Sequence, residues 1–281
     1  MIDSLRTMPA TIVEVISLWV KIYALLVSVI AGIFSTKRLA RFWKTRHLRK
    51  VWGIKDGDYV IIVCSEMDEP EKRQKIEPRE FIYNLKYGDV DAYFEVVVTL
   101  LRLFPKIKLR IMSSGEAIAS KMDLERHLIL IGGPDYNEIT AGILKKNLTQ
   151  FQYRSPDMQE VSTHYPNEIV LFDSVKKREL CELDYEKDFG YFERVKNPNN
   201  PNNKIILLGG CHTIGVTSAV KAFSLADSEH GEIPKMVLLN ARKVAKVITS
   251  KSEFSVLVSA EQVGQTISVP VVEQKNITVR R

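Results

Sequence analysis

The feature that most constrains this chain is an apolar segment of 25 residues near its N-terminus, followed at once by a basic cluster. Residues Ala10 to Phe34 read ATIVEVISLWVKIYALLVSVIAGIF, with two charged residues and no proline. At a rise of 1.5 Å per residue, a helix of this length crosses the roughly 30 Å hydrocarbon layer of a bilayer. We therefore expect an N-terminal single transmembrane helix within residues 1–36.

The charges on either side of this segment predict its orientation. Seven basic residues lie between Lys37 and Lys50, whereas Arg6 and the terminal amine precede the apolar run. The positive-inside rule then predicts a single-pass protein of the inner (plasma) membrane, with the N-terminus outside and the C-terminal domain cytoplasmic. A cleaved signal peptide would carry its basic residues before the apolar run. An amphipathic helix lying on the membrane surface is the remaining alternative.

Residues 37–50 are expected to form a basic juxtamembrane segment. Leu39, Phe42 and Trp43 are interspersed among the basic side chains, a composition typical of a helix lying against anionic lipid headgroups. A flexible basic linker is the alternative interpretation. Both interpretations keep the segment at membrane lipid.

Small and polar residues follow one side of the apolar segment. They recur at heptad spacing in two rows, which together form a seam: Glu14, Ser17, Lys21, Ala24, Ser28 and Ala31. Small residues allow helices to approach closely, and polar groups buried in lipid are stabilised by pairing. The seam therefore favours a homo-oligomeric helix bundle, and a pore is one form of it. The alternative is a single anchor in which Glu14 and Lys21 reach opposite membrane interfaces.

The rest of the chain, residues 51–281, has the composition of a globular domain. The first 50 residues hold nine basic and two acidic side chains, whereas the remainder holds 31 basic and 32 acidic ones. The domain therefore lacks the overall positive charge that favours binding to a nucleic-acid duplex. Its cysteines, Cys64, Cys181 and Cys211, are odd in number and without metal-ligand spacing, so we expect neither a disulfide framework nor a metal site.

Short apolar runs alternate with helical patterns through this domain. This alternation predicts an α/β fold with a Rossmann-like, mostly parallel sheet and an antiparallel C-terminal edge after Phe254. Residues 197–203 (NPNNPNN) are expected to be a surface loop. The predicted strands are 59–64, 108–112, 127–131, 168–172, 204–208 and 254–258, and the predicted helices are 92–104, 137–147, 215–225 and 241–248.

Two similar segments carry most of the functional information. Residues 127–146 (HLILIGGPDYNEITAGILKK) and 204–223 (KIILLGGCHTIGVTSAVKAF) both give an apolar strand, a Gly-Gly pair, a turn, a threonine and a helix. Glycines at such a turn let backbone amides approach a phosphate, which the helix N-terminus also favours. Ordinary tight turns are the alternative. The candidate ligand-binding residues are Gly132, Gly133, Pro134, Asp135, Asn137, Thr140, Gly209, Gly210, Cys211, His212, Thr213, Gly215 and Thr217, with Ser218 as a further donor.

Catalytic chemistry has weaker support in the sequence. Cys211 and His212 are adjacent, but neighbouring side chains on a turn usually point apart, which disfavours a Cys–His pair. The chain has no Walker A motif, no HExxH and no complete GxGxxG, so we assign no catalytic residue and expect no required cofactor other than a nucleotide ligand. Acidic residues that could form a pair for N-glycosidic hydrolysis are Glu66, Asp68, Asp89, Asp91 and Asp135.

A polar-seamed membrane helix, a basic segment and an α/β domain with two phosphate-type turns resemble, in domain layout only, the membrane effectors of bacterial antiviral systems. These include the CRISPR-associated effectors and those driven by cyclic oligonucleotides. The resemblance implies a membrane-anchored effector whose cytosolic domain senses a small nucleotide and controls an oligomeric helix bundle or pore. A membrane-tethered enzyme that cleaves a nucleotide or NAD is the first alternative, and a recruiter of a protein partner to the membrane is the second.

Overall fold

The computed structural model describes residues 10–65, 87–154, 162–163, 170–181, 187–226, 232–263 and 266–280, which form two units, Met1–Arg46 and His47–Arg281. The helices are α1 (Ala10–Trp52), α2 (Tyr87–Leu103), α3 (Ser114–Ala119), α4 (Glu138–Lys145), α5 (Thr213–Lys221) and α6 (Lys235–Val247), with 3-10 helices η2 (Lys121–Glu125) and η4 (Gln274–Asn276). The strands are β1 (Tyr59–Cys64), β2 (Lys108–Ser113), β3 (His127–Ile131), β4 (Phe151–Arg154), β5 (Val170–Asp173), β6 (Arg178–Leu180), β7 (Lys187–Asn197), β8 (Asn200–Gly210), β9 (Glu253–Val263), β10 (Thr266–Ile267) and β11 (Ile277–Arg280).

The first unit contains most of the long helix α1. Its described side chains from Glu14 to Val29 are all exposed. Among the residues that the structure describes, no helix satisfies both the length and the apolarity that a membrane span requires.

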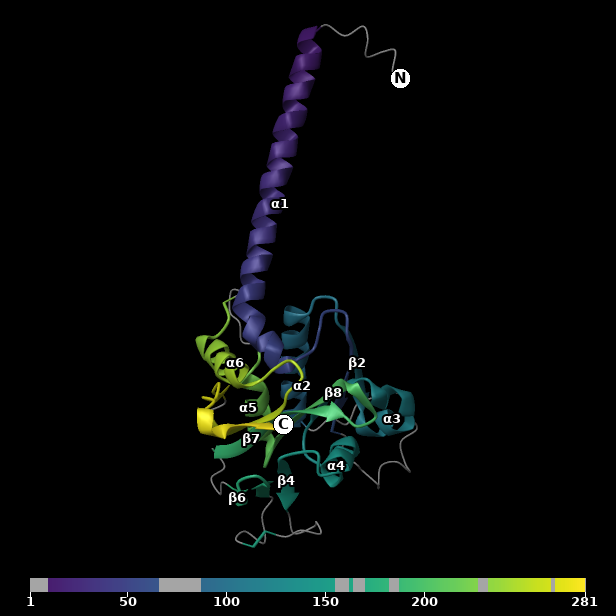
Figure 1. Ribbon diagram of the computed structural model, residues 1–281, viewed down its shortest axis with the longest axis vertical. Helices are drawn as coiled ribbons and strands as arrows, with labels where there is room; N and C mark the ends of the chain where they lie inside the picture. Colours follow the sequence, from purple (N-terminus) through teal and green to yellow (C-terminus); the bar gives the residue numbers. More distant parts are fainter. Residues whose placement is uncertain are drawn as a thin grey trace. The chain divides into compact units, whose positions relative to one another are not determined.

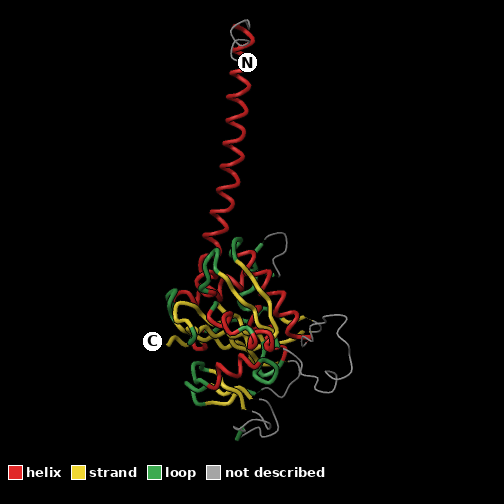
Figure 2. The backbone as a smooth tube through the Cα atoms, turned by 90° about the vertical axis from the view of Figure 1, so that its right-hand side faces the viewer, coloured by secondary structure: helices red, strands yellow, loops and turns green. Residues whose placement is uncertain are grey.

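A mixed sheet organises the second unit. Over the described residues it has eight strands in the order β10-β9-β7-β8-β3-β1-β2, with β11 also paired to β9 (Figures 1 and 2). The strands β2, β1, β3 and β8 are parallel, while β7, β9, β10 and β11 pair antiparallel. The prediction of an α/β fold with an antiparallel C-terminal edge is confirmed. The sheet is mixed rather than mostly parallel, because the antiparallel part begins at β7, a strand that the sequence analysis did not find.

Side chains alternate between the two faces of this sheet, as the pleat of a strand requires. Along β1, Val60, Ile62 and Cys64 pack into one core, and Ile61 and Val63 pack into the other. Helices α2, α5 and α6 cover the first face, and α3, α4 and the small antiparallel sheet β4-β5-β6 cover the second. In Figure 1, α5 and α6 lie on one side of β7 and β8, and α3 and α4 lie on the other.

The segment predicted to be a surface loop is a hairpin turn. Strand β7 ends at Asn197, the turn is Pro198–Asn199, and β8 begins at Asn200. The Asn197 side chain is fully buried and donates to the carbonyl oxygens of Leu124 and Arg126 at 2.7 and 2.8 Å. The asparagine therefore fixes the turn that precedes β3, which accounts for a buried polar residue there.

The last residues of α1 belong to the globular unit. Leu48, Val51 and Trp52 are completely buried in the core of the first sheet face. The Trp52 indole N–H donates to the Phe223 carbonyl oxygen at 3.2 Å, and its ring packs edge-on against Phe192. The end of α1 is thus part of the hydrophobic core and not a linker.

A buried arginine on β7 holds this end of α1. One nitrogen of the Arg194 guanidinium donates to the carbonyl oxygens of Lys50 and Val51 at 2.7 and 2.8 Å. The other nitrogens donate to the carbonyl oxygens of Thr249 and Ser252, which follow α6. Because helix carbonyls at a C-terminus lack intrahelical partners, Arg194 serves as a cap that also joins α1 to β7 and to the end of α6.

Replacing this arginine should destabilise the globular unit. An Arg194→Met variant keeps an apolar side chain near Phe254 but leaves the four carbonyl groups without their donor. Charge-assisted hydrogen bonds of this kind predict a loss of about 3 kcal/mol, or about 6–12 °C in Tm for a domain of this size. Thermal unfolding followed by circular dichroism measures the change. Lys196→Met is the matched control, because this side chain on the same strand is 63% exposed and should change Tm little; equal Tm values for the two variants would contradict the role given to Arg194.

Candidate functional site

The two Gly-Gly turns lie side by side at the carboxyl ends of two adjacent parallel strands. Strands β3 and β8 pair with Ile131 opposite Leu208, and the Gly132 amide donates to the Leu208 carbonyl oxygen at 3.0 Å. Gly132 has φ +93°, a conformation that favours glycine. Ligands of open α/β sheets bind at this edge. The structure therefore brings together the two segments that the sequence singled out.

Asn137 holds the first turn from inside. Its amide oxygen accepts a hydrogen bond from the Thr140 amide at 3.1 Å and so caps α4. Its amide nitrogen donates to the carbonyl oxygens of Val63 and Ile131 at 3.3 and 3.1 Å. Asn137 is completely buried and ties the ends of β1 and β3 to the start of α4. Both its donor hydrogens and its oxygen are occupied, which indicates a structural role for the side chain.

A carboxylate occupies the second turn. One oxygen of Asp188, on β7, accepts hydrogen bonds from the amides of His212 and Gly215 at 2.9 and 2.6 Å. These are amides at the start of α5 that a phosphate would otherwise use. Asp188 is buried, and burial raises the pKa of its carboxyl group while the backbone hydrogen bonds oppose that rise. The protein thus supplies its own anion here. The sequence analysis missed Asp188, because nothing in the spacing connects it to a turn that follows it by more than 20 residues.

The glycines of the second turn allow close packing. A Cβ atom on Gly210 would lie 2.6 Å from the backbone carbon of Gly215 and from the nitrogen of Val216. A Cβ atom on Gly190, in β7, would overlap the Gly215 carbonyl oxygen. Helix α5 therefore begins in direct backbone contact with β7 and β8. Gly133 differs, because a Cβ atom there would make an ordinary 3.6 Å contact with the Tyr153 ring.

Tyr153 of the small sheet lies between the two turns. Its hydroxyl donates to the Gly210 carbonyl oxygen at 3.0 Å, and its ring faces Gly133. Tyr191 packs edge-on against it and stacks on Phe151. Burial raises the pKa of Tyr153 well above its ordinary value, which keeps the hydroxyl protonated as a donor. This aromatic cluster fills the space on the second sheet face beneath the turns, so a ligand at this edge has to bind from the outside.

The remaining predicted ligand residues divide by exposure. Asp135, His212 and Thr213 are exposed, Gly133 and Pro134 are half-buried, and Thr140, Gly209, Gly210, Cys211, Gly215, Thr217 and Ser218 are buried. The exposed and half-buried members come mainly from the first turn. The outer surface of residues 133–135, together with His212 and Thr213, is therefore the part of the predicted site that a ligand can reach.

Cys211 has the environment of a structural thiol. It is buried, and its sulfur lies 3.4 Å from the Leu180 carbonyl oxygen. Burial, followed by the nearby Asp188 carboxylate, raises the pKa of the thiol, and a thiolate is what nucleophilic attack requires. Among the described residues, no group of three or more His, Cys, Asp or Glu side chains could hold a metal ion. Of the acidic residues considered for hydrolysis, Asp91 and Asp135 are exposed, and the side chains of Glu66, Asp68 and Asp89 lie outside the described residues.

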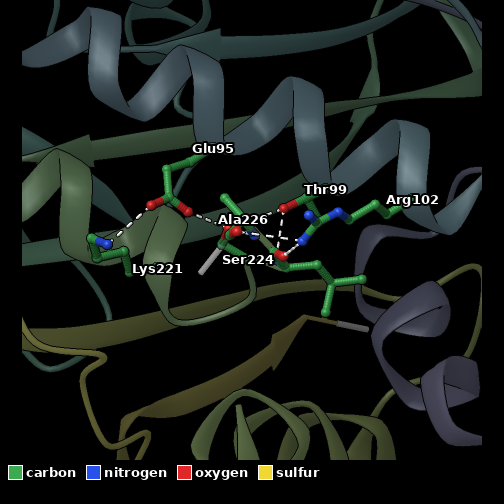
Figure 3. A network of polar contacts seen from close by, with 7 residues as sticks. Glu95, Thr99, Arg102, Lys221, Ser224 and Ala226 are labelled. Atoms are coloured by element: carbon green, nitrogen blue, oxygen red, sulfur yellow. Dashed lines mark hydrogen bonds and ion pairs between the residues drawn. The ribbon is translucent and has the colours of Figure 1, made fainter. Parts of the chain in front are cut away.

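One predicted residue, Thr217, also lines a pocket of about 340 Å³ between α2 and α5. Two residues that line the pocket form an ion pair: the Lys221 ammonium lies 3.0 Å from the Glu95 carboxylate. The Ser224 hydroxyl donates to the same carboxylate (Figure 3). Thr99 and Arg102 extend the network to the residues after α5, with Thr99 bonded to Ser224 at 3.0 Å. The network joins α2 to α5, and its polar groups are satisfied by one another.

Comparison with protein-family models finds no matching family, and no curated protein or solved structure is significantly similar to the chain.

Proposed function

We propose that the protein is a membrane-anchored effector. Helix α1 would be its membrane anchor, with the N-terminus outside, and the globular unit would be a cytoplasmic, Rossmann-like domain that senses a nucleotide. The observation that carries the proposal is the surface of α1. Within residues 15–29, its exposed large hydrophobic side chains, between 39% and 70% accessible, are Val15, Ile16, Leu18, Trp19, Val20, Ile22, Tyr23, Leu25, Leu26, Val27 and Val29.

A helix with this much exposed apolar surface requires a cover. Exposed apolar patches of soluble monomers rarely exceed a few hundred Å². The apolar sequence extends beyond these side chains, from Ala10 to Phe34, and the basic residues from Lys37 onward follow it. Lipid covers such a segment on every side, whereas a groove on a protein partner covers only part of it. The membrane is therefore the environment that best accounts for α1.

The seam supports assembly of several copies. Glu14, Ser17, Lys21, Ala24 and Ser28 are all exposed, and the side chain of Ala31 lies outside the described residues. The Ser28 hydroxyl donates to the Ala24 carbonyl oxygen at 2.8 Å, so this polar group needs no partner beyond the helix. Glu14 and Lys21 remain as charges that gain from facing another copy of the helix or water.

The hydrogen bonds from Arg194 to the end of α1 support a link between nucleotide sensing and helix assembly. The last residues of α1 are fixed in the core of the globular unit, and Arg194 joins their carbonyls to β7 and to the turn after α6. A ligand that displaces these elements therefore acts on α1 without an intervening linker. The nucleotide itself is proposed from the paired turns, of which the first offers the accessible surface. The similarity in layout to bacterial antiviral effectors supports the same function.

Cysteine crosslinking of the seam tests the assembly. Single cysteines at positions 14, 21 and 28, in a Cys181→Ser background that removes the less buried native thiol, should give crosslinked oligomers in membranes. Cysteines at positions 19 and 26, on the opposite side of the helix, should not.

A Lys21→Leu variant should still reach the membrane, because leucine favours insertion by about 0.3–0.6 kcal/mol. It should lose ion leakage or toxicity on activation. Equal, weak crosslinking on both sides together with full activity of Lys21→Leu would identify α1 as a plain anchor.

A further inference from the structure

A basic pocket lies beside the end of α1. It is at the other ends of the strands from the Gly-Gly turns. It has a volume of about 230 Å³ and is lined by Arg194, Lys196, Lys204 and Lys251, with Glu253 as its one carboxylate. Lys196 pairs with Glu253 at 3.7 Å. Lining side chains come from β7, β8 and the turn that enters β9, so they are positioned by three paired strands.

Two of these cations also contact the end of α1. Arg194 donates to the carbonyl oxygens of its last turn, and the Lys204 ammonium donates to the Gly53 carbonyl oxygen at 2.5 Å. Gly53 has φ +64°, and a Cβ atom there would lie 2.9 Å from the Lys204 nitrogen. Glycine at this position ends the helix in the left-handed conformation and leaves room for both cations.

The end of the helix does not neutralise these cations. A helix C-terminus carries about half a negative charge, whereas Arg194 and Lys204 carry two positive charges. Among the described residues, no carboxylate lies within 4.0 Å of either cationic group. Burial lowers the pKa of Arg194 to about 10. Burial and then the Arg194 charge lower the pKa of Lys204 to about 8, although the Asp58 carboxylate opposes the shift. An excess of positive charge therefore remains in the pocket.

We propose that this pocket binds the phosphate group of a soluble ligand. A phosphate oxygen accepts hydrogen bonds from ammonium groups and neutralises the excess charge, and the pocket is large enough for one or two phosphoryl groups. A lipid headgroup offers the same chemistry. Binding measured in zwitterionic and in anionic lipid separates the two sources.

This phosphate site goes beyond the proposed function, and only its effect on α1 rests on that function. A phosphate in this pocket would contact the Lys204 ammonium, which also holds the end of α1. The five N–H groups of Arg194 are already bonded to carbonyl oxygens, so Arg194 would act through its charge. The pocket shares no residue with the paired turns, so its phosphate ligand and a nucleotide at the first turn would occupy separate sites. Binding itself can be measured whether or not the helices assemble.

Pyrophosphate binding to the full-length protein in nanodiscs of zwitterionic lipid tests the proposal by calorimetry. We expect Lys204→Gln and Lys251→Gln each to weaken binding roughly tenfold, because each removes one charge-assisted contact while glutamine preserves a donor. Lys145→Gln, an exposed lysine on α4, is the matched control and should bind like the wild type. Unchanged Tm values show that the variants are folded.

Three results would overturn the inference: no binding at 10 mM pyrophosphate (about the weakest affinity worth measuring), equal binding by all three variants, or binding that anionic lipid in the nanodisc abolishes. The last result would assign the pocket to a headgroup. Membrane retention and seam crosslinking are measured on the same preparations. Their success alongside failed pyrophosphate binding would reject this pocket and leave the proposed anchor and its assembly in place.

Discussion

A full-length variant carrying Ile22→Asp and Leu26→Asp should leave the membrane. Both side chains lie near the middle of the apolar segment, and Leu26 lies on the side of α1 away from Glu14 and Lys21. An aspartate at the centre of a membrane helix costs about 2.5–3.5 kcal/mol, and the lost isoleucine and leucine add about 0.3–0.6 kcal/mol each. The sum of about 6–8 kcal/mol corresponds to a change of more than about 10⁴-fold in partitioning. Flotation on a density gradient and carbonate extraction measure it.

The matched control is Ile22→Ala with Leu26→Ala, which shortens the same side chains without adding charge and should stay in the membrane fraction. A soluble globular unit in the aspartate variant, with the Tm of the wild type, would show that only the anchor was lost. Retention of the aspartate variant after carbonate treatment would contradict membrane insertion. The apolar surface of α1 would then require a protein partner or a second copy as its cover.

Sequence reasoning located the strands that carry continuous apolar runs. Strands β1 and β3 begin and end at the predicted residues, and 108–112, 204–208 and 254–258 lie within β2, β8 and β9. The four predicted helices correspond to α2, α4, α5 and α6, although α2 begins at Tyr87 and not at residue 92, and α6 begins at Lys235 and not at residue 241. These elements could be predicted because burial on a sheet face and a helical period both leave a local pattern.

Strand β7 could not be found in this way, although it lies in the middle of the sheet. Its sequence contains Asp188, Glu193 and Arg194, which resemble a surface segment, yet all three are buried. Their partners are distant in the sequence: Glu193 accepts a hydrogen bond from the Gln150 amide at 2.7 Å and pairs with Arg280 at 2.7 Å. Burial raises the pKa of Glu193 to about 7, and the Arg280 charge opposes that rise. A polar residue whose partner is more than 40 residues away leaves no local pattern.

In the candidate site, too, the sequence predicted the local turns but not the contacts made by residues distant in the chain. The glycine pairs predicted two turns at the ends of parallel strands, and the structure places both turns there. The groups that fill those turns are Asp188 and Tyr153, which belong to other strands. The glycine motif contains no information about either residue. The sequence therefore located the edge of the sheet but not the groups that fill it.

Gly210→Ala should prevent stable folding, whereas Gly133→Ala should be tolerated. The added Cβ at Gly210 would lie 2.6 Å from backbone atoms of Gly215 and Val216, which cannot rotate away as a side chain can. Helix α5 would have to move off β8, and the amides held by Asp188 would move with it. We expect a loss of roughly 4 kcal/mol or more, beyond the usual range for core overpacking. The methyl group at position 133 would make only an ordinary contact at 3.6 Å.

Thermal unfolding and the soluble yield of the globular unit distinguish these variants. Gly142→Ala is a further control, because a Cβ atom there meets nothing within 4 Å and helix α4 gains propensity, so Tm should stay the same or rise slightly. Nucleotide binding by folded Gly133→Ala then addresses function separately from stability. A Gly210→Ala protein that folds with the wild-type Tm would show that α5 does not pack on β8 as described. The interpretation of Gly209–Gly210 as an open phosphate cradle would then regain its support, because the amides of α5 would be free to meet a ligand.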